Sequence, residues 1–465
     1  MNLPQKFKEY AAESLGEQIS QQLFSKIDSS EFITSVRKNP FKMGAETSNT
    51  PVKWCPDGYY LSQRPLFTLD PLFHCGAYYV QEASSMYMHI VKEAIENQKP
   101  GFWEKGITAL DLCAAPGGKS THLLSILNKD SVLVSNEVIK SRCTILADNI
   151  AKWGCSNSIV SNNDPADFCS LTQTFNLIIV DAPCSGEGLF RKDSDAINEW
   201  SPDNVKLCAA RQQRILSDIW DSLLPDGFLV YSTCTYNKYE NDGNLAFLEE
   251  EFGAQIIPIP INKEWGIITT PKGGLQFVPG LVNGEGQYMA IVRKKGEDTD
   301  LQGKRKEKRK DKRGVNAQQE KGCPFVPQGY IGELMGDIVK AYPANLHSKI
   351  KQLEGSLKIA LSGVAVAVKK GKDYIPHPDL ALQSFIAQQI ANNNLPKAIK
   401  AVEVNTQDAL KFLSKEALTF PEQPNGYLLL HYKGNGLGYV KNLGNRSNNL
   451  HPMARRIRMD ITSNL

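Results

Sequence analysis

The sequence predicts an α/β protein organised around an open, mostly parallel β-sheet. Short apolar runs at 107–112, 131–136, 177–180 and 228–232 have the composition of buried strands. The first three runs have an acidic residue at or just beyond their end, and stretches with helical spacing separate successive runs. Strands that alternate with helices are typical of a doubly wound sheet, in which ligands bind beyond the carboxyl ends of the strands.

Length and composition set the limits of this prediction. At 465 residues, the chain is too long for one ordinary hydrophobic core, and its 41% hydrophobic and 22% charged residues are typical of globular domains. No run of 18 apolar residues occurs, which predicts that no helix spans a membrane. The first residues, MNLPQKFKEYAAESLG, lack an apolar signal core, which predicts a cytoplasmic protein. The ten cysteines include no Cys-x-x-Cys pair, so free thiols are expected and a zinc site is not.

Residues 1–90 are expected to form a small α+β domain. Apolar residues recur at helical spacing over 4–27, which predicts one helix with an apolar face. Residues 35–39 favour a surface strand, although Arg37 and Asn39 on it could contact a ligand.

A small-residue turn separates the first strand of the sheet from the helix that follows it. The strand is expected at Ile107–Leu112, the turn at Cys113–Gly118 and the helix at Lys119–Leu127. Small residues let the backbone approach a ligand closely, and a helix N-terminus favours nucleotide-like ligands. The turn is neither GxGxxG nor a Walker loop, which excludes a kinase or NTPase. His122 is interpreted as an ordinary residue of the helix.

Two acids follow the second and third expected strands, at 131–136 and 158–160. Glu137 lies roughly 20 residues beyond the glycine turn, the position from which an acid binds ribose hydroxyls. Asp164 follows the third strand, and an acid there can reach an adenine amino group. The pattern therefore indicates a ligand that contains a nucleoside.

Two cysteines lie just beyond the fourth and fifth expected strands. The run 177–180 leads into Asp181-Ala-Pro-Cys184, and the run 228–232 is followed by a threonine and then Cys234. Neighbouring strands of a doubly wound sheet bring their ends together. Asp181, Cys184 and Cys234 are therefore expected to lie close to one another.

Two thiols beside an acid suit an enzyme that acts on C5 of a pyrimidine. That carbon is a poor nucleophile until a thiolate adds at C6, and a base must later remove the C5 proton so that the thiol can leave. A reference pKa of about 8.5 leaves cysteine with some thiolate at neutral pH. The spacing does not decide whether Cys184 or Cys234 attacks, and it leaves open that one of them is only a buried thiol.

The part beyond the sheet begins with a concentration of positive charge. Residues 304–313, KRKEKRKDKR, have a net charge of +6, so the remainder of the +3 chain is slightly acidic. We expect residues 296–322 to be a basic linker, either simply solvated or contacting phosphates.

Two further units are expected after the linker. Residues 323–420 are interpreted as an intermediate domain, with helices at 332–342 and 379–392 and a buried strand at 363–368. Residues 421–465 contain a strand, a glycine-containing turn and a second strand, which predicts a hairpin.

Three motifs, ALDLCAAPGGKS, DAPCSGEGLFRKD and YSTCTYNKYEND, resemble those of the Fmu/Sun-type RNA (cytosine-5) methyltransferases in composition, order and distance. VQEASSM and FVPGLVNGEGQYMAIVRK also match, so the resemblance covers about residues 30–295, and the ending resembles the PUA-like tail of the RsmF type. The resemblance implies a Rossmann-like S-adenosylmethionine-dependent methyltransferase domain over 91–295. It also implies an RNA-binding α+β domain over 1–90 and a C-terminal extension ending in an RNA-binding, PUA-like β-barrel over 421–465.

The resemblance also implies roles for individual residues. Cys234 would be the nucleophile, Cys184 would assist release of the methylated base, and Asp181 would lie near cytosine N3. The residues implied to bind S-adenosylmethionine are Cys113, Ala114, Ala115, Pro116, Gly117, Gly118, Lys119, Glu137, Asp164 and Asp181.

RNA is the expected partner, and the C-terminal resemblance favours 16S rRNA of the small ribosomal subunit. No membrane, metal or obligate protein partner is implied. Basic residues after the loop that contains Cys184, and others near the C-terminus, are candidates for RNA contacts. The alternative is that they are ordinary exposed charges. The candidates are Arg191, Lys192, Lys441, Arg446, Arg455, Arg456 and Arg458.

Three alternatives stay open at this stage. The substrate could be tRNA. A DNA cytosine methyltransferase would use Cys184, in the Pro-Cys motif, as its nucleophile. A protein of another class, a non-catalytic RNA-binding ribosome assembly factor, could retain the same fold, although such a protein has no need of Cys184, Cys234 and Asp181 together.

Overall fold

The computed structural model describes residues 3–29, 33–44, 50–296, 318–396 and 398–461. The basic run 304–313, and most of the expected linker around it, lie outside the described residues. Among the helices that the structure describes, none is long and apolar enough to cross a membrane.

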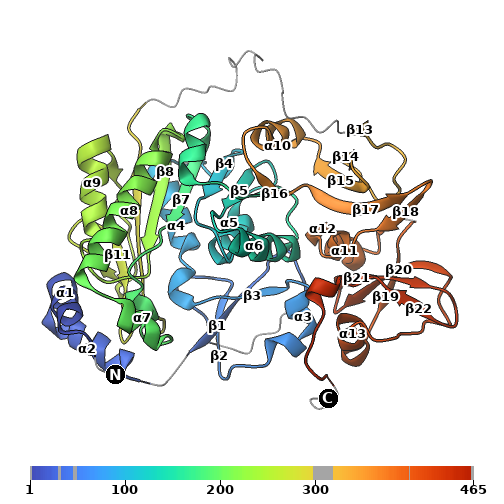
Figure 1. Ribbon diagram of the computed structural model, residues 1–465, viewed down its shortest axis with the longest axis horizontal. Coiled ribbons are helices and arrows are strands. Elements are labelled where there is room, and N and C mark those ends of the chain that lie inside the picture. The colour runs from blue at the N-terminus through green and yellow to red at the C-terminus, as the bar shows by residue number, and fades with distance from the viewer. Residues whose placement is uncertain (1–2, 30–32, 45–49, 297–317, 397, 462–465) are drawn as a thin grey trace.

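A ten-stranded sheet forms the centre of the molecule (Figure 1). Its five parallel strands lie side by side in the order β6, β5, β4, β7, β8, so the chain starts in the middle and winds outward in both directions. This order confirms the doubly wound sheet and makes β7 and β8 neighbours. The five strands are β4 (Thr108–Asp111), β5 (Val132–Asn136), β6 (Ser158–Ser161), β7 (Phe175–Asp181) and β8 (Leu223–Thr233).

Antiparallel strands extend the sheet beyond β8. β12 pairs with β8 and with the short β9, and the edge continues through β11 to β10. These strands are β9 (Gln255–Ile256), β10 (Ile268–Thr269), β11 (Leu275–Phe277) and β12 (Gln287–Arg293).

Helices cover both faces of the sheet, because its strands are apolar on both sides. Within β4, for example, Ala109 belongs to one hydrophobic cluster and Leu110 to the other. The first cluster takes in α4 (Met88–Gln98), α5 (Gly118–Ile126) and α6 (Lys140–Trp153). The second takes in η3 (Pro165–Ser170), α8 (Pro202–Trp220), α9 (Asp242–Phe252) and α10 (His347–Glu354).

The N-terminal residues form two helices, not the single one expected over 4–27. Gly16 interrupts the helix, because its φ of 82° does not occur in an α-helix. It separates α1 (Gln5–Leu15) from α2 (Glu17–Ile27). Both helices pack beside the loop that follows β7, where Phe7 contacts the ring of Phe190. A three-stranded antiparallel sheet follows, with β1 (Thr34–Lys38) between β2 (Gly58–Leu61) and β3 (Tyr78–Val80). Short helices η1 (Phe67–Leu69), α3 (Pro71–His74) and η2 (Ala83–Ser85) complete this part.

The region after the linker contains more strand than expected. The predicted helix at 332–342 is wrong: β14 (Tyr330–Met335) and β15 (Ile338–Pro343) form a hairpin instead, and Gly336, with φ of 65°, makes its turn. The predicted helix at 379–392 is divided into α11 (Pro378–Ala381) and α12 (Ser384–Ala391). The strand expected at 363–368 is confirmed. The five-stranded sheet also contains β13 (Gln318–Gln319), β17 (Val364–Lys370) and β18 (Asp373–Pro376).

The last part of the chain forms a four-stranded sheet that includes the predicted hairpin. β20 (Gly426–Tyr432) and β21 (Asn435–Asn442) are its antiparallel centre, flanked by β19 (Lys400–Glu403) and β22 (Ser447–Asn449). Helix α13 (Thr406–Leu413) and η7 (Met453–Arg455) pack nearby. Because β19 belongs to this sheet, we propose that the C-terminal unit begins near Lys400, earlier than residue 421.

One strand from beyond the linker belongs to the central sheet. β16 (Ile359–Ser362) pairs antiparallel with β6, the outer parallel strand, with Ser362 opposite Ile159. The pairing satisfies the backbone groups of β6 on that side. The central sheet is therefore completed by residues that follow the linker.

Candidate active site

The turn between β4 and α5 lines a cavity of about 180 Å³ at the carboxyl edge of the sheet. Gly117 makes the turn possible, because its φ of 113° is a backbone conformation that residues with a side chain rarely adopt. A Cβ there would also approach Leu146 to 3.2 Å. The residues that line the cavity are Tyr79, Val80, Gln81, Glu82, Ser85, Asp111, Cys113, Ala114, Ala115, Pro116, Gly118, Lys119 and Asp181.

Charged groups surround this cavity. Lys119 Nζ lies 2.8 Å from Asp181 Oδ2, and Asp181 Oδ1 accepts a hydrogen bond from Ser232 Oγ at 2.6 Å. Asp111 is fully buried, and burial raises its pKa to about 7, although a hydrogen bond from Ser120 opposes the shift. Its Oδ1 has no hydrogen-bond partner. A buried acceptor without a partner fits a ligand that brings a donor such as an ammonium group.

Glu137 and Asp164 lie just beyond β5 and β6, at the same edge of the sheet as the cavity, but neither lines it. Glu137 is 3% exposed, accepts a hydrogen bond from the backbone N–H of Ile139 at 2.9 Å and lies 3.4 Å from Arg142. Asp164 accepts from the N–H of Ala166 at 3.1 Å. The structure thus places both acids along one edge with the turn, as the sequence predicted.

Cys184 and Cys234 face each other, with their Sγ atoms 3.2 Å apart and no disulfide between them. The parallel pairing of β7 with β8 brings the thiols together, because Asp181 lies opposite Ser232 and the cysteines follow three and two residues later, respectively. The hydrogen bond with Cys234, together with burial, raises the pKa of Cys184 well above its ordinary value. Cys184 therefore keeps its proton and can donate it toward Cys234.

Glu187 holds the two thiol-containing loops together, a role that the sequence reading did not assign. It is 1% exposed, and its Oε2 accepts hydrogen bonds from the backbone N–H groups of Tyr236 and Asn237 at 2.7 and 3.1 Å. The N–H of Gly188 donates to the carbonyl of Cys234 at 2.7 Å, and a Cβ on Gly188 would collide with that oxygen. The sequence feature that could have indicated this role is an acid between two glycines in a motif of small residues.

The sequence favoured a surface strand for Arg37, but the structure places this residue on β1 with its side chain fully buried. Its guanidinium donates to Gln81 Oε1 at 2.8 Å, to Thr121 Oγ1 at 2.7 Å and to the carbonyl of Gly118 at 3.3 Å. Thr121 and Gly118 belong to the first turns of α5. The N-terminal sheet therefore supports α5, the helix that follows the turn Cys113–Gly118.

Two candidates for RNA contact are paired with carboxylates of the protein itself. Arg191 is 8% exposed and lies 3.3 Å from Glu285. Arg455 makes ion pairs with Asp148 at 2.5 Å and Asp379 at 2.7 Å. Because these contacts direct both guanidinium groups toward protein carboxylates, we no longer propose Arg191 and Arg455 as phosphate contacts.

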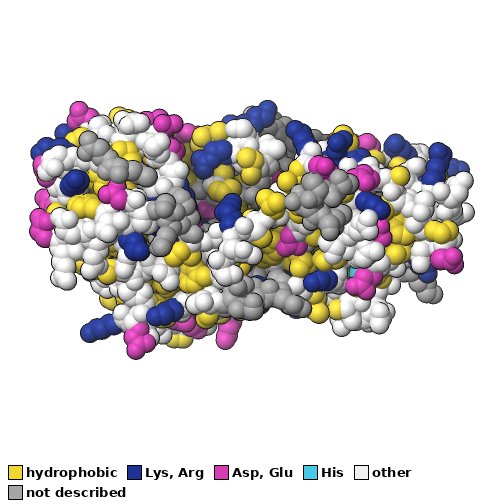
Figure 2. Space-filling model, turned by 90° about the horizontal axis from the view of Figure 1, so that it is seen from below, with side chains coloured by type: hydrophobic (Ala, Val, Ile, Leu, Met, Phe, Trp, Pro, Cys, Tyr) yellow, Lys and Arg dark blue, Asp and Glu magenta, His cyan; other side chains and the backbone are white. Residues whose placement is uncertain are grey.

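The other five candidates are exposed, so they can still reach RNA: Lys192, Lys441, Arg446, Arg456 and Arg458. Lys441 also lies over the ring of Tyr427, 5.6 Å from its centroid. Figure 2 shows the described lysine and arginine side chains dispersed among acidic and apolar ones on one face of the molecule, where they form no single basic band. Charge alone therefore does not locate an RNA path on this face.

Three family models match the chain in order. The model of the N-terminal domain of 16S rRNA methyltransferase RsmF matches residues 3–83, that of 16S rRNA methyltransferase RsmB/F matches 103–293, and that of the methyltransferase RsmF PUA domain matches 399–457. The chain belongs to the RsmB/F family of 16S rRNA methyltransferases. A protein of this family is an S-adenosylmethionine-dependent RNA methyltransferase, which is the activity that the cavity and its acids fit.

Two relatives that carry the same name match different lengths of the chain. "Ribosomal RNA small subunit methyltransferase F" of Shewanella sp. (strain MR-4) is 28% identical over 476 residues, which cover 97% of each protein. The protein of the same name from Enterobacter sp. (strain 638) is 33% identical over 279 residues, 56% of each protein.

Solved structures share the fold of the RsmB/F chain. A methyltransferase homologue from Pyrococcus horikoshii is 25% identical, with a TM-score of 0.51, and the match covers 62% of this chain and 93% of that one. NSun6 from Pyrococcus horikoshii with SFG is 18% identical, with a TM-score of 0.52, over 63% of this chain and 99% of that one. These matches agree with the S-adenosylmethionine-dependent methyltransferase fold.

Proposed function

We propose that this RsmB/F chain methylates C5 of a cytosine in 16S rRNA through a covalent bond between Cys234 and C6 of the base. The observation that best supports the proposal is the 3.2 Å separation of the Cys184 and Cys234 sulfurs at the ends of adjacent strands. C5 and C6 are bonded neighbours in the ring, so two groups this close together can act on both atoms.

The hydrogen bond between the thiols prepares Cys234 for attack. When Cys184 retains its proton, its S–H can donate to the sulfur of Cys234 and stabilise the thiolate there. The thiolate adds to C6, which leaves electron density at C5. Asp181 lies at the end of the strand that leads to Cys184, and we propose that it faces cytosine N3, where an acid supports the charge that addition creates.

Release of the product needs the opposite behaviour from Cys184. Once Cys234 is bonded to C6, its sulfur no longer shares a proton with Cys184, and the largest cause of the raised pKa of Cys184 is removed. Cys184 can then release its own proton to solvent, and the thiolate that this leaves can accept the C5 proton. The C5 proton moves to the Cys184 sulfur, the C6–S bond breaks, and Cys234 leaves as a thiolate.

Bound S-adenosylmethionine supplies an electrophilic methyl group on a positively charged sulfur. We propose that the turn Cys113–Gly118 with Lys119 surrounds this cofactor in the cavity, and that the unpartnered Asp111 Oδ1 accepts a hydrogen bond from its ammonium group. Glu137 and Asp164, beyond the adjacent strands, are proposed to bind the ribose hydroxyls and the adenine amino group.

Bisulfite sequencing of RNA from a strain lacking this gene, compared with its parent, tests the proposal. We expect one protected cytosine to disappear from 16S rRNA. Loss of protection in tRNA would keep the chemistry and change the substrate. Unchanged protection in all RNA would contradict the catalytic proposal and favour the non-catalytic assembly factor. A cytoplasmic location stays a prediction.

Substitutions of Arg455 and Arg458 distinguish an arginine that stabilises the fold from one that binds RNA. We expect Arg455→Ala to lower the free energy of unfolding by about 1–3 kcal/mol, because it leaves two partly buried carboxylates without their ion pairs. Chemical denaturation measures this loss. Arg458→Ala, at an exposed position, is the control: it should leave stability unchanged, weaken RNA binding and reduce its salt dependence. Weaker RNA binding by Arg455→Ala at unchanged stability would restore Arg455 as an RNA contact.

A further inference from the structure

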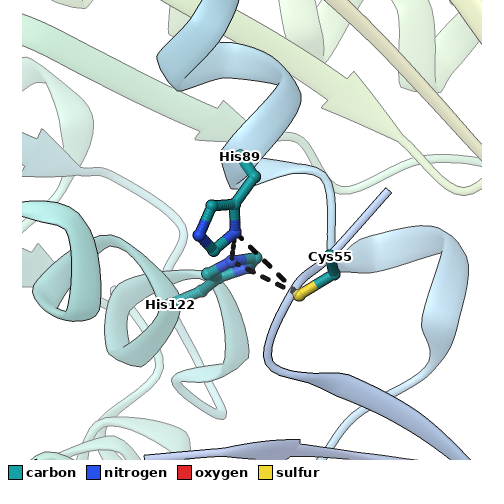
Figure 3. Close-up of side chains that lie close together, drawn as sticks. All are labelled: Cys55, His89 and His122. Carbon is teal, nitrogen blue, oxygen red and sulfur yellow. Dashed lines mark hydrogen bonds between the residues drawn. The ribbon is translucent and has the colours of Figure 1, made fainter. Parts of the chain in front are cut away.

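A cysteine and two histidines that the proposed mechanism does not use converge at one point (Figure 3). Cys55 lies in the turn before β2, His89 on α4 and His122 on α5. Cys55 Sγ is 4.0 Å from His89 Nδ1 and 3.8 Å from His122 Nε2, and the two nitrogens are 2.9 Å apart. Cys55 and His122 are fully buried, and His89 is half-buried.

Protons alone satisfy this arrangement poorly. Each ring nitrogen that faces the cluster has one site, which either carries a proton or accepts one. A hydrogen bond between the two rings uses both sites, and the thiol of Cys55 then finds no free acceptor on either ring. A single cation between the three atoms would contact all three lone pairs at once.

Both imidazoles are in the form that binds metals. Burial lowers the pKa of His89 to about 4 and that of His122 well below its ordinary value, so both rings are neutral near pH 7. Burial raises the pKa of the Cys55 thiol to about 12, while the nearby positive charge of Arg37 opposes that shift. A bound metal would have to displace the thiol proton, as it does at other cysteine ligands.

We propose that Cys55, His89 and His122 form a binding site for a zinc ion. Tetrahedral zinc, with its usual bond lengths, places two nitrogen ligands about 3.3 Å apart and a nitrogen and a sulfur about 3.6 Å apart. The observed separations of 2.9, 3.8 and 4.0 Å need adjustments of only about half an ångström. Imidazole and thiolate are ligands that zinc prefers, and the partly exposed side of His89 leaves room for water as a fourth ligand.

The site would join the N-terminal part to the cofactor-binding helix. On α5, His122 lies one helical turn after Lys119, which lines the proposed cofactor cavity. Cys55 belongs to the loop that precedes β2. Arg37 already connects β1 to α5 nearby. A zinc ion would add a second connection, so its role would be to stabilise this junction and not to take part in methyl transfer.

Sequence spacing gave no sign of the site. The expectation that the chain binds no metal rested on the lack of a Cys-x-x-Cys pair. This cluster needs only one cysteine, and its three ligands come from separate elements that the fold brings together.

Cobalt binding to the full chain tests the proposal. Cys184 and Cys234 also form a close pair of thiols, so the measurement uses the Cys184→Ala, Cys234→Ala background. We expect this protein to bind one Co²⁺ with thiolate-to-cobalt absorption, and Zn²⁺ to displace it. Adding Cys55→Ala should remove the absorption and weaken Zn²⁺ binding by at least about tenfold.

Cys143→Ala in the same background is the matched control, because Cys143 is another buried thiol, on α6, outside the cluster. It should leave metal binding unchanged. His89→Gln, at a half-buried position, provides a second test if Cys55→Ala does not fold, and it should weaken Zn²⁺ binding. The proposal is overturned if the background protein shows no thiolate-to-cobalt absorption, if the absorption persists in Cys55→Ala, or if His89→Gln binds Zn²⁺ as tightly as the background protein.

Discussion

Cys234→Ala is expected to lower methyl transfer to RNA by more than about a thousandfold, because no other group is placed to form the bond to C6. The sulfur of Cys184 is 3.2 Å away, but the proposed mechanism requires it to act at C5. Transfer of a labelled methyl group from S-adenosylmethionine to 16S rRNA measures the loss. RNA affinity should change little, since the substitution removes one atom from a half-buried site.

Cys208→Ala is the matched control for this experiment. Cys208 is a buried thiol on α8, outside the catalytic loops, so its loss should leave turnover within a few-fold of the parent. If Cys234→Ala retained normal turnover while Cys184→Ala lost it, the nucleophile would be Cys184, as in DNA cytosine methyltransferases.

Cys184→Ala is expected to trap the enzyme on its RNA. Cys234 can still attack, although more slowly without the hydrogen bond from Cys184, but no thiol remains to accept the C5 proton. The C6–S bond then persists, and a band containing both protein and RNA should survive a denaturing gel. We expect most of the active enzyme to accumulate in this band, against almost none for the parent.

The Cys184→Ala, Cys234→Ala double variant shows whether that band is the proposed adduct. It lacks the attacking thiol and should form no band, whereas Cys184→Ala combined with Cys208→Ala should still form it. Failure of Cys184→Ala to accumulate the adduct, with Cys234 present, would rule out the release role of Cys184.

The central fold was predictable from the sequence because its strands are buried on both faces. Such strands are continuous apolar runs, and the chain alternates them with helices, so the sheet and the pairing of β7 with β8 followed from local patterns. The secondary structure from residue 318 onward was harder to predict from the sequence. The pattern of residues 332–342 predicts a helix, whereas in the structure Gly336 turns the chain in the middle and the two halves pair as strands.

The site was predictable as far as its motifs reached. Cys184, Cys234 and the cofactor turn follow strand ends, so topology alone brings them to one edge. Supporting residues could not be found in that way. Arg37 reaches α5 from another sheet, and Glu187 contacts a loop far along the chain; both depend on tertiary packing that no local pattern encodes.

The pairing of β16 with β6 bears on how the chain matures during synthesis. All five parallel strands leave the ribosome before β16 exists, so the nascent catalytic sheet has an open edge at β6 until residues 359–362 emerge. An open strand edge is a template for pairing with another chain. Pauses in translation between β12 and β16, or release of the chain after Arg293, should therefore favour aggregation. The edge at β6 is covered only once β16 has been synthesised and has paired with it.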